Sequence, residues 1–360
     1  MAYSTINDPS AYFQTALYTG NGTSTNAVTN TGNSNLKPDF LWLKSRSIIA
    51  DHILFDSTRG TNKRLSSNTS GVEETQAFYS SFDTDGFTIG DSNANVNQNN
   101  ATYVNWQWKA NGGTTSSNTD GTITSTVQAN TTSGFSIITY TGTGSNGTIG
   151  HGLNSAPEYW AVKPLTNVSD NQWFVCHKNI NGTNTDYADY FIHWDTTGAK
   201  QDNNLMWNYT VPTNSVISLG SKPGTNYNGG SFVCYAFHGV QGYSKFNFYT
   251  GNGSADGPFI YTGFKPQYVA VKNVSATAPW RIYSQQISNH ATPFNDLDEC
   301  FFINTNEVAT DTGHPFDFLA NGFKVRGTNV DVNTDTNQYM YIAFADQSLV
   351  GTNDVIALAR

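Results

Sequence analysis

Short apolar runs, separated by polar and glycine-rich stretches, recur along the chain in the same order three times. The first run of each series ends in Tyr-Thr-Gly: "FQTALYTG" begins at Phe13, "FSIITYTG" at Phe135 and "FNFYTG" at Phe246. Runs of this length, rich in aromatic and β-branched residues and bounded by Gly and Asn, predict β-strands. The pattern also lacks the 3.6-residue period of a long amphipathic helix.

Each of these strands leads into nearly the same turn: "YTGNG" at 18–22 and 249–253, and "YTGTG" at 140–144. Glycine adopts positive φ without steric cost, which suits a tight reversal. The tyrosine is expected to bury its ring and to bond a backbone group through its hydroxyl. A phosphate-binding loop would need a helix after the glycines, whereas the residues that follow are rich in Asn and Thr. The repeated turn is therefore predicted to be structural.

Four further landmarks follow each turn in a fixed order. They are a strand from proline to lysine ("KPDFLWLK" at 37–44, "APEYWAVK" at 156–163, "KPQYVAVK" at 265–272), a second strand ("HILFDS", "WFVCHK", "WRIYSQ"), a short β segment ("GFTIG", "SVISLG", "GFKVRG") and an aromatic closing strand ("YVNWQW", "FVCYAF", "YMYIAF"). The terminal lysine is interpreted as a solvated charge that limits unwanted strand pairing. Five ordered landmarks in three copies indicate one unit of roughly 100 residues in triplicate. Each unit is expected to bury its own apolar interior.

The sequence therefore predicts an all-β protein made of three tandem antiparallel repeats. The divisions are an N-terminal attachment segment at 1–12, repeat one at 13–110, a linker at 111–133 with room for one short strand, repeat two at 134–241, repeat three at 242–345 and a C-terminal tail at 346–360. Because only "GVQGYSK" joins repeats two and three, these two are expected to pack as a rigid pair.

Composition narrows the class of protein. Charged residues make up only 12%, against about 25% in an ordinary soluble domain, and the 14% of aromatics argues against disorder. A net charge of −9 argues against a nucleic-acid partner. The polar N-terminus indicates no signal peptide, no apolar run approaches a membrane span, and no cofactor is indicated. Three scattered cysteines, Cys176, Cys234 and Cys300, are predicted to be buried and unpaired.

Candidate catalytic and metal-binding groups are weak. The densest acidic cluster, "DLDEC" at 296–300, is equally well explained by a solvated loop, and glycoside hydrolysis needs two carboxyl groups at a set separation. The stretches "DTDG" at 83–86 and "DVNTDTN" at 331–337 resemble calcium loops, but neither supplies the ordered set of oxygen ligands that calcium requires. The histidines have no zinc-ligand spacing. The sequence thus predicts no catalytic residue and no metal site.

Tryptophans offer the one candidate ligand site. Trp173 and Trp280 occupy matching positions of their repeats, which favours a core role. Trp194 and Trp207 lie where repeat two diverges most from the others. If their rings are exposed, a sugar could stack on them, with nearby Asn and Asp groups fixing its hydroxyls.

The combined pattern resembles a repeat domain of tailed-bacteriophage structural proteins, often labelled tail fibre or virion structural protein and frequent in marine phages. The resemblance covers nearly the whole chain, including "INDPSAYFQTALYTGNG" at its start and "LVGTNDVIALAR" at its end. It implies a β-sandwich per copy, concanavalin-like or jelly-roll-like, and attachment to a virion assembled in the host cytoplasm. It carries no catalytic residues to this chain.

These observations lead to the expectation of a non-enzymatic virion surface protein. The leading role is a tail fibre or host-adhesion protein, expected to be a homotrimer by family analogy alone, with other virion proteins as partners and a host surface glycan as candidate ligand. The first alternative is a capsid decoration protein. The second is a polysaccharide depolymerase, which needs a carboxylate pair that the sequence does not locate.

Overall fold

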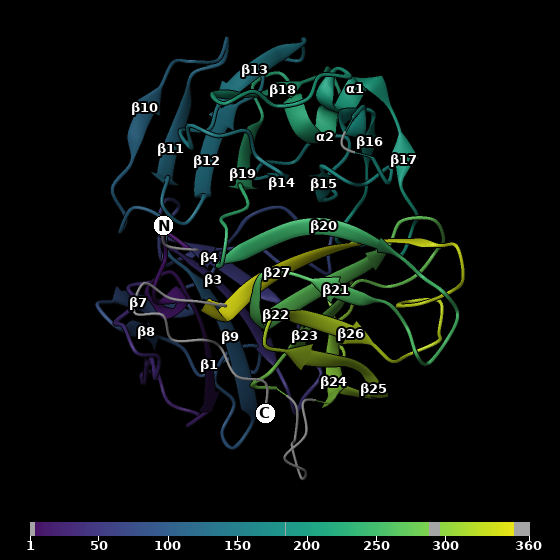
Figure 1. The fold of residues 1–360 in the computed structure, drawn as a ribbon. Coiled ribbons are helices and arrows are strands. Elements are labelled where there is room, and N and C mark those ends of the chain that lie inside the picture. The colour runs from purple at the N-terminus through teal and green to yellow at the C-terminus, as the bar shows by residue number, and fades with distance from the viewer. Residues whose placement is uncertain (1–3, 184, 288–295, 349–360) are drawn as a thin grey trace.

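A computed structural model describes residues 4–183, 185–287 and 296–348. The protein is all-β, as predicted, and every strand pairing is antiparallel except one isolated bridge. Its strands form three lobes around a common centre (Figure 1). We call these lobes units one, two and three.

The elements of each unit follow in chain order. Unit one contains η1 (Pro9–Ala11), β1 (Phe13–Thr19), β2 (Asn26–Thr29), β3 (Phe40–Ser45), β4 (Ile53–Asp56), β5 (Lys63–Arg64), β6 (Glu74–Thr75), β7 (Tyr79–Asp83), β8 (Gly86–Ile89) and β9 (Thr102–Trp108). Unit two contains β10 (Ser116–Asn118), β11 (Ser125–Asn130), β12 (Phe135–Thr141), β13 (Gly147–Gly150), β14 (Tyr159–Pro164), β15 (Phe174–His177), η2 (Tyr187–Asp189), β16 (Tyr190–Phe191), β17 (Gln201–Asp202), α1 (Asn204–Trp207), β18 (Val216–Leu219), α2 (Pro223–Asn226) and β19 (Ser231–Phe237). Unit three contains β20 (Ser244–Thr250), β21 (Phe259–Tyr261), β22 (Phe264–Asn273), β23 (Arg281–Ser284), β24 (Asp296–Phe302), β25 (Thr310–Leu319), β26 (Gly322–Val325) and β27 (Gln338–Ser348).

The same strand order occurs in all three units. The main sheets contain β1-β9-β3-β4, β12-β19-β14-β15 and β20-β27-β22-β23, so the closing strand always lies between the turn strand and the proline strand. A second pairing also repeats, as β2 with β8, β13 with β18 and β21 with β26. The five sequence landmarks thus correspond to five equivalent strands in each unit.

The units differ in how their sheets close. Units one and two each have a smaller sheet separate from the main one, whereas unit three forms one continuous eight-stranded sheet from β20 to β21. Strand pairing alone thus separates a second sheet in units one and two and keeps the equivalent strands joined to the main sheet in unit three. The acidic segment "DLDEC" lies in strand β24 and not in a loop.

Residues 111–133, predicted to be a linker, contain two strands that belong to unit two. Strand β11 pairs with β12 along its whole length, and β10 pairs with β11. Both lie in the upper lobe of Figure 1. The predicted tail begins inside β27, which continues to Ser348, and residues 349–360 lie outside the described residues.

The centre of the molecule is a ring cluster shared by the three units. The last aromatic of each closing strand, Trp108, Phe237 and Phe344, contacts the other two, with ring centroids 5.5–6.5 Å apart. The apolar core that contains them extends through all three units, and units one and three have further cores of their own. The expectation that each unit buries its own interior therefore holds for units one and three, whereas unit two has no core separate from the shared one, because the three main sheets pack against one another.

The lysines that end the proline strands are buried, which corrects their interpretation as solvated charges. Lys44, Lys163 and Lys272 have no exposed surface. Each ammonium donates to a backbone carbonyl of another unit: Lys44 to Asn306, Lys163 to Thr69 and Lys272 to Thr197. Unit one thus bonds unit three, unit two bonds unit one, and unit three bonds unit two.

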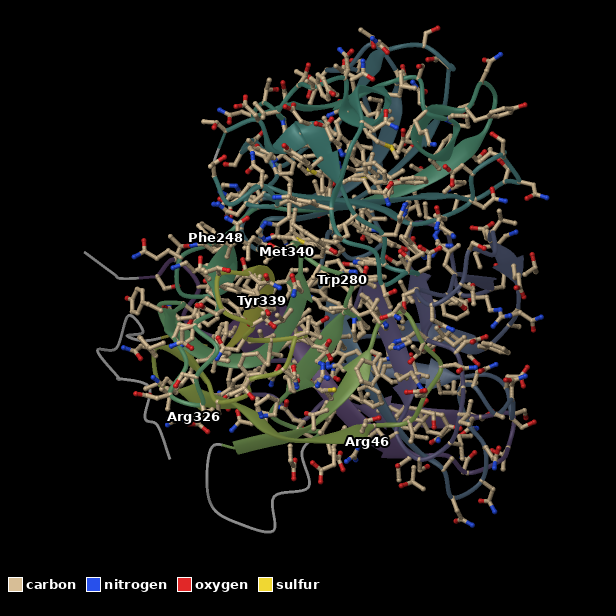
Figure 2. The ribbon with its side chains drawn as sticks, turned by 90° about the vertical axis from the view of Figure 1, so that its right-hand side faces the viewer. Arg46, Phe248, Trp280, Arg326, Tyr339 and Met340 are labelled. Atoms are coloured by element: carbon tan, nitrogen blue, oxygen red, sulfur yellow. The ribbon has the colours of Figure 1, made fainter. Side chains whose placement is uncertain are left out.

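A second set of equivalent side chains repeats this cycle. The Trp173 indole donates to the Ser66 carbonyl at 2.8 Å and the Trp280 indole to the His193 carbonyl at 2.7 Å, while His52 in unit one lies 3.0 Å from the Phe302 carbonyl. Figure 2 shows Trp280 at the boundary between units two and three. Six bonds that run in the same direction around the molecule therefore join the units into a ring with local threefold character.

The repeated turn is held by tyrosine, as predicted. The hydroxyls of Tyr18, Tyr140 and Tyr249 donate to the carbonyls of Val96, Thr225 and Val332 at 2.5–2.7 Å. Of the two glycines only the second has positive φ, for example +69° at Gly22. The first is needed for close packing, because a Cβ at Gly20 would lie 2.1 Å from the Gln98 carbonyl oxygen.

A buried asparagine that the sequence analysis missed completes each turn. The side chains of Asn97, Asn226 and Asn333 accept from the residue between the two glycines, and their carbonyls accept from the second glycine. Each asparagine stands six residues before the first aromatic of the closing strand. That constant spacing was the available signal.

Candidate binding cleft between units two and three

The tryptophans predicted to stack on a sugar lie in the interior. Trp194 is 3% exposed, donates to the Tyr159 hydroxyl at 2.7 Å and packs on Trp173. Trp207 is 0% exposed and donates to the Tyr190 carbonyl. The prediction required exposed rings, so the structure corrects it: both residues belong to the shared apolar core, and neither offers a ring face to a ligand.

The acidic stretches are engaged in contacts within the protein. Glu299 of "DLDEC" lies 3.8 Å from Arg46 of unit one. Asp83 accepts from Ser81 and Thr88 at the β7–β8 turn, and Asp331 accepts from Arg281. Among the described residues no group of three or more His, Cys, Asp or Glu side chains is placed to hold a metal ion. The three cysteines are free and buried, as predicted.

Two hollows of about 320 and 360 Å³ flank one ion pair, which joins the lysine after β15 to the glutamate before β14. The Lys178 ammonium lies 2.5 Å from the Glu158 carboxylate, and both side chains are partly exposed. The larger hollow is lined by residues of unit two, including Asn214 and His238. The smaller one lies at the joint with unit three. Volumes of this size are typical of small-ligand and side-chain binding sites.

Unit three supplies the opposite wall of the smaller hollow. The Lys245 ammonium donates to the Tyr261 carbonyl at 2.9 Å and lies 5.2 Å from the centre of the Tyr261 ring, which is 46% exposed. Partial burial lowers the pKa of Lys245, and the charge of Lys178 lowers it further, while Glu158 opposes both. Two ammonium groups against one carboxylate give this hollow a net positive charge in a protein of net charge −9.

The equivalent position at the joint of units one and two is filled by the chain itself. Asp39 and Ser57 stand where unit two has Glu158 and Lys178, as the equivalent backbone bonds show. The Gln128 side chain of β11 lies on this pair and bonds the Ser57 hydroxyl at 3.0 Å. Its Oε1 also accepts from the Gly113 backbone N–H at 2.8 Å. The segment 111–133 therefore occupies a place that stays open in the next joint.

The cleft could not be found from sequence. Glu158 and Lys178 are common surface residue types, 20 positions apart, and their significance depends on a neighbouring segment being short. Among the described residues that line the two hollows, Glu158 is the one carboxylate. The cleft can therefore donate hydrogen bonds from two ammonium groups and accept them at one carboxylate, but it does not present the carboxyl pair of a glycosidase.

The fold and cleft define a class: a single chain of three equivalent β units that close around a shared core. Residues 8–348 match the DUF7483 family, described as a domain of unknown function, and the chain belongs to this family. The match spans all three units. No curated protein and no solved structure matches the chain. No helix among the described residues is long and apolar enough to cross a membrane.

Proposed function

We propose that the protein is a non-enzymatic structural protein on the surface of a bacteriophage particle, with host adhesion by a tail fibre as its leading role. The observation that supports this proposal is the interlocked ring of three units. Lysine-to-carbonyl bonds link all three units into a closed ring, and its described hollows contain no catalytic carboxylate pair. A closed ring of units and a sparsely charged surface suit a particle component that must keep its shape and avoid non-specific binding.

Head decoration is the second candidate. One chain already arranges three equivalent units about a local axis, so a single copy could cover a threefold position of a shell without forming a homotrimer. The fibre role, by contrast, goes with three chains. The other virion proteins remain the proposed partners in both roles, and the particle is the proposed location.

The proposal includes the finer fold description. We treat each unit as a β-sandwich module, concanavalin-like or jelly-roll-like, because in unit one a four-stranded sheet faces a smaller sheet across a buried apolar core. An experimental structure superposed on known sandwich folds tests this description.

Quantitative mass spectrometry of purified particles tests the function. A fibre is expected at a few copies per particle and a decoration protein at tens to hundreds, while light scattering of the pure protein separates a trimer from a monomer. Absence of the protein from washed particles would refute the proposal. Release of reducing sugars from host polysaccharide, abolished by Glu158→Gln, would instead support a depolymerase.

A further inference from the structure

Unit two shows how an added strand closes the gap that each unit has between its turn strand and its second sheet. In unit two this gap lies between β12 and β13. Strand β11 fills it by pairing with β12 from Ser125 to Asn130. At its far side, the Ser125 hydroxyl donates to the Gly150 carbonyl of β13 at 2.8 Å.

Unit one spans its gap with one side chain, Gln14, which stands four residues before the turn tyrosine as Lys245 does in unit three. Gln14 of β1 donates to the Ser34 carbonyl and accepts from the Gly32 backbone N–H, so that the loop after β2 is held against β1. Among the described residues, only unit two therefore pairs a strand of its own chain with the outer side of the turn strand.

In unit three the gap is spanned by one side chain. Strand β20 pairs with β27 on one side, and no described strand pairs with its other side. The Lys245 ammonium bonds the Tyr261 carbonyl, which is equivalent to the Gly150 carbonyl that Ser125 bonds in unit two. The smaller hollow of the cleft lies at this position.

The free edge of β20 is prepared for pairing but protected. The Phe248 backbone N–H points away from β27 and donates to the Asn247 carboxamide at 2.9 Å. A lysine and a carboxamide along an edge limit indiscriminate strand addition. Both side chains can swing away, because neither is buried. Figure 2 shows Phe248 below unit two, at the outer side of unit three.

We infer that β20 accepts an extended, polar strand of another polypeptide, added in the way that β11 adds to β12. In that register the side chain opposite Phe246 enters the hollow beside Glu158 and Lys178, as Gln128, opposite Ile137, lies on Asp39 and Ser57. The partner strand is therefore rich in Ser and Thr and carries a carboxamide at that position. That the partner is another virion protein rests on the proposed function; the docking site does not.

The sequence of β11 itself provides the probe. A fluorescently labelled peptide with residues 121–132, GTITSTVQANTT, is titrated against the full-length protein, and binding is followed by anisotropy. Backbone pairing supplies most of the affinity of an added strand, so saturable binding is expected. Hydrogen exchange is expected to slow in β20 and to stay unchanged in β12, the equivalent strand that β11 already covers.

Variants locate the site. Phe248→Pro removes the outward N–H without touching the ladder to β27, and binding is expected to weaken about tenfold or more. Lys245→Ala removes the ammonium that bonds the Tyr261 carbonyl and is expected to strengthen binding about fivefold. Lys200→Ala is the matched control, since Lys200 also lies 5.2 Å from a tyrosine ring, and it should change nothing. A peptide with Ala in place of its Gln should bind about tenfold more weakly.

Several outcomes would overturn the inference. They are no peptide binding at millimolar concentration, equal binding by the Phe248→Pro variant, or slowed exchange outside β20. Wild-type self-association abolished by Phe248→Pro would make a second copy of this chain the partner instead. Saturable binding of glucose or galacturonate hexasaccharides in place of the peptide would assign the cleft to a glycan. None of these results depends on finding the protein in a particle.

Discussion

The joint between units one and two (joint 1/2) and the joint between units two and three (joint 2/3) are built on the same frame but finished differently. In both, a buried lysine and a tryptophan of one unit bond carbonyls of the unit before it. Joint 1/2 also contains Gln128 and a carboxylate with three donors, whereas joint 2/3 ends in the solvated pair of Glu158 and Lys178.

The two joints share the bonds that close the ring, and they differ in the residues beside Asp39 and Glu158. The lysine and tryptophan bonds are the same at these two joints, so they serve closure of the ring. The position beside Asp39 or Glu158 is filled in one joint and open in the other, so closure does not depend on it. That freedom makes joint 2/3 the place for a partner.

The largest effect is expected from the tryptophans that both joints share. Trp173→Ala and Trp280→Ala should each lower the free energy of unfolding by about 3–5 kcal/mol, since each removes a fully buried ring and leaves a carbonyl unbonded. Guanidinium unfolding measures both. A loss at one joint and not at the other would show that the frame is not shared.

Substituting Asp39 is expected to show the clearest difference in stability between the two joints. Its carboxylate accepts from Ser57, Ala110 and Gly112, and burial raises its pKa against the effect of these bonds. Asp39→Ala should cost about 2–4 kcal/mol because buried donors are left unsatisfied. Glu158→Ala should cost less than about 1 kcal/mol, as expected for a partly exposed pair. Similar losses in urea unfolding would contradict the comparison.

The buried lysines predict an unusual pH dependence. Burial lowers the pKa to about 8 for Lys44 and Lys163 and to about 7 for Lys272, against the effect of nearby carboxylates. Between pH 7 and about 10 the unfolded chain therefore binds more protons, and the free energy of unfolding should rise with pH by on the order of 2 kcal/mol per lysine. Each Lys→Met variant should flatten this slope, and Lys63→Met, at the surface, should not.

The smallest effect is expected from Gln128, the side chain that fills the position beside Asp39 in joint 1/2. Gln128→Ala removes bonds to Ser57, Thr58 and Gly113 and should cost about 1–2 kcal/mol. Gln201→Ala, an exposed residue of β17, is the control and should have no measurable effect. Hydrogen exchange of the Gly113 amide should accelerate in the first variant only, and unchanged exchange would remove Gln128 from its assigned role.

Local features were predictable because their causes are local. The tyrosine turn follows from a strand, a ring and two glycines within five residues, and the equivalent strands follow from repeated landmarks. The mutual packing of the units was not predictable, since nothing in "KPQYVAVK" indicates that its final ammonium meets Thr197. Charged and aromatic side chains were assigned by residue type, which placed the lysines outside and left Trp194 as a candidate ligand residue. Gln128 had no signal at all, because its role depends on a joint between two units.

The direction of the inter-unit bonds has a consequence for how this architecture can evolve. An open row of repeats has two ends and can grow or shrink by whole copies. Here unit one bonds unit three, which closes the ring. Adding a fourth unit or deleting one would leave lysine ammonium groups and backbone carbonyls without their bonding partners. The number of units is therefore fixed at three. Sequence change is confined to the segments that connect the units, where a few inserted or deleted residues decide whether the hollow at a joint is filled or open.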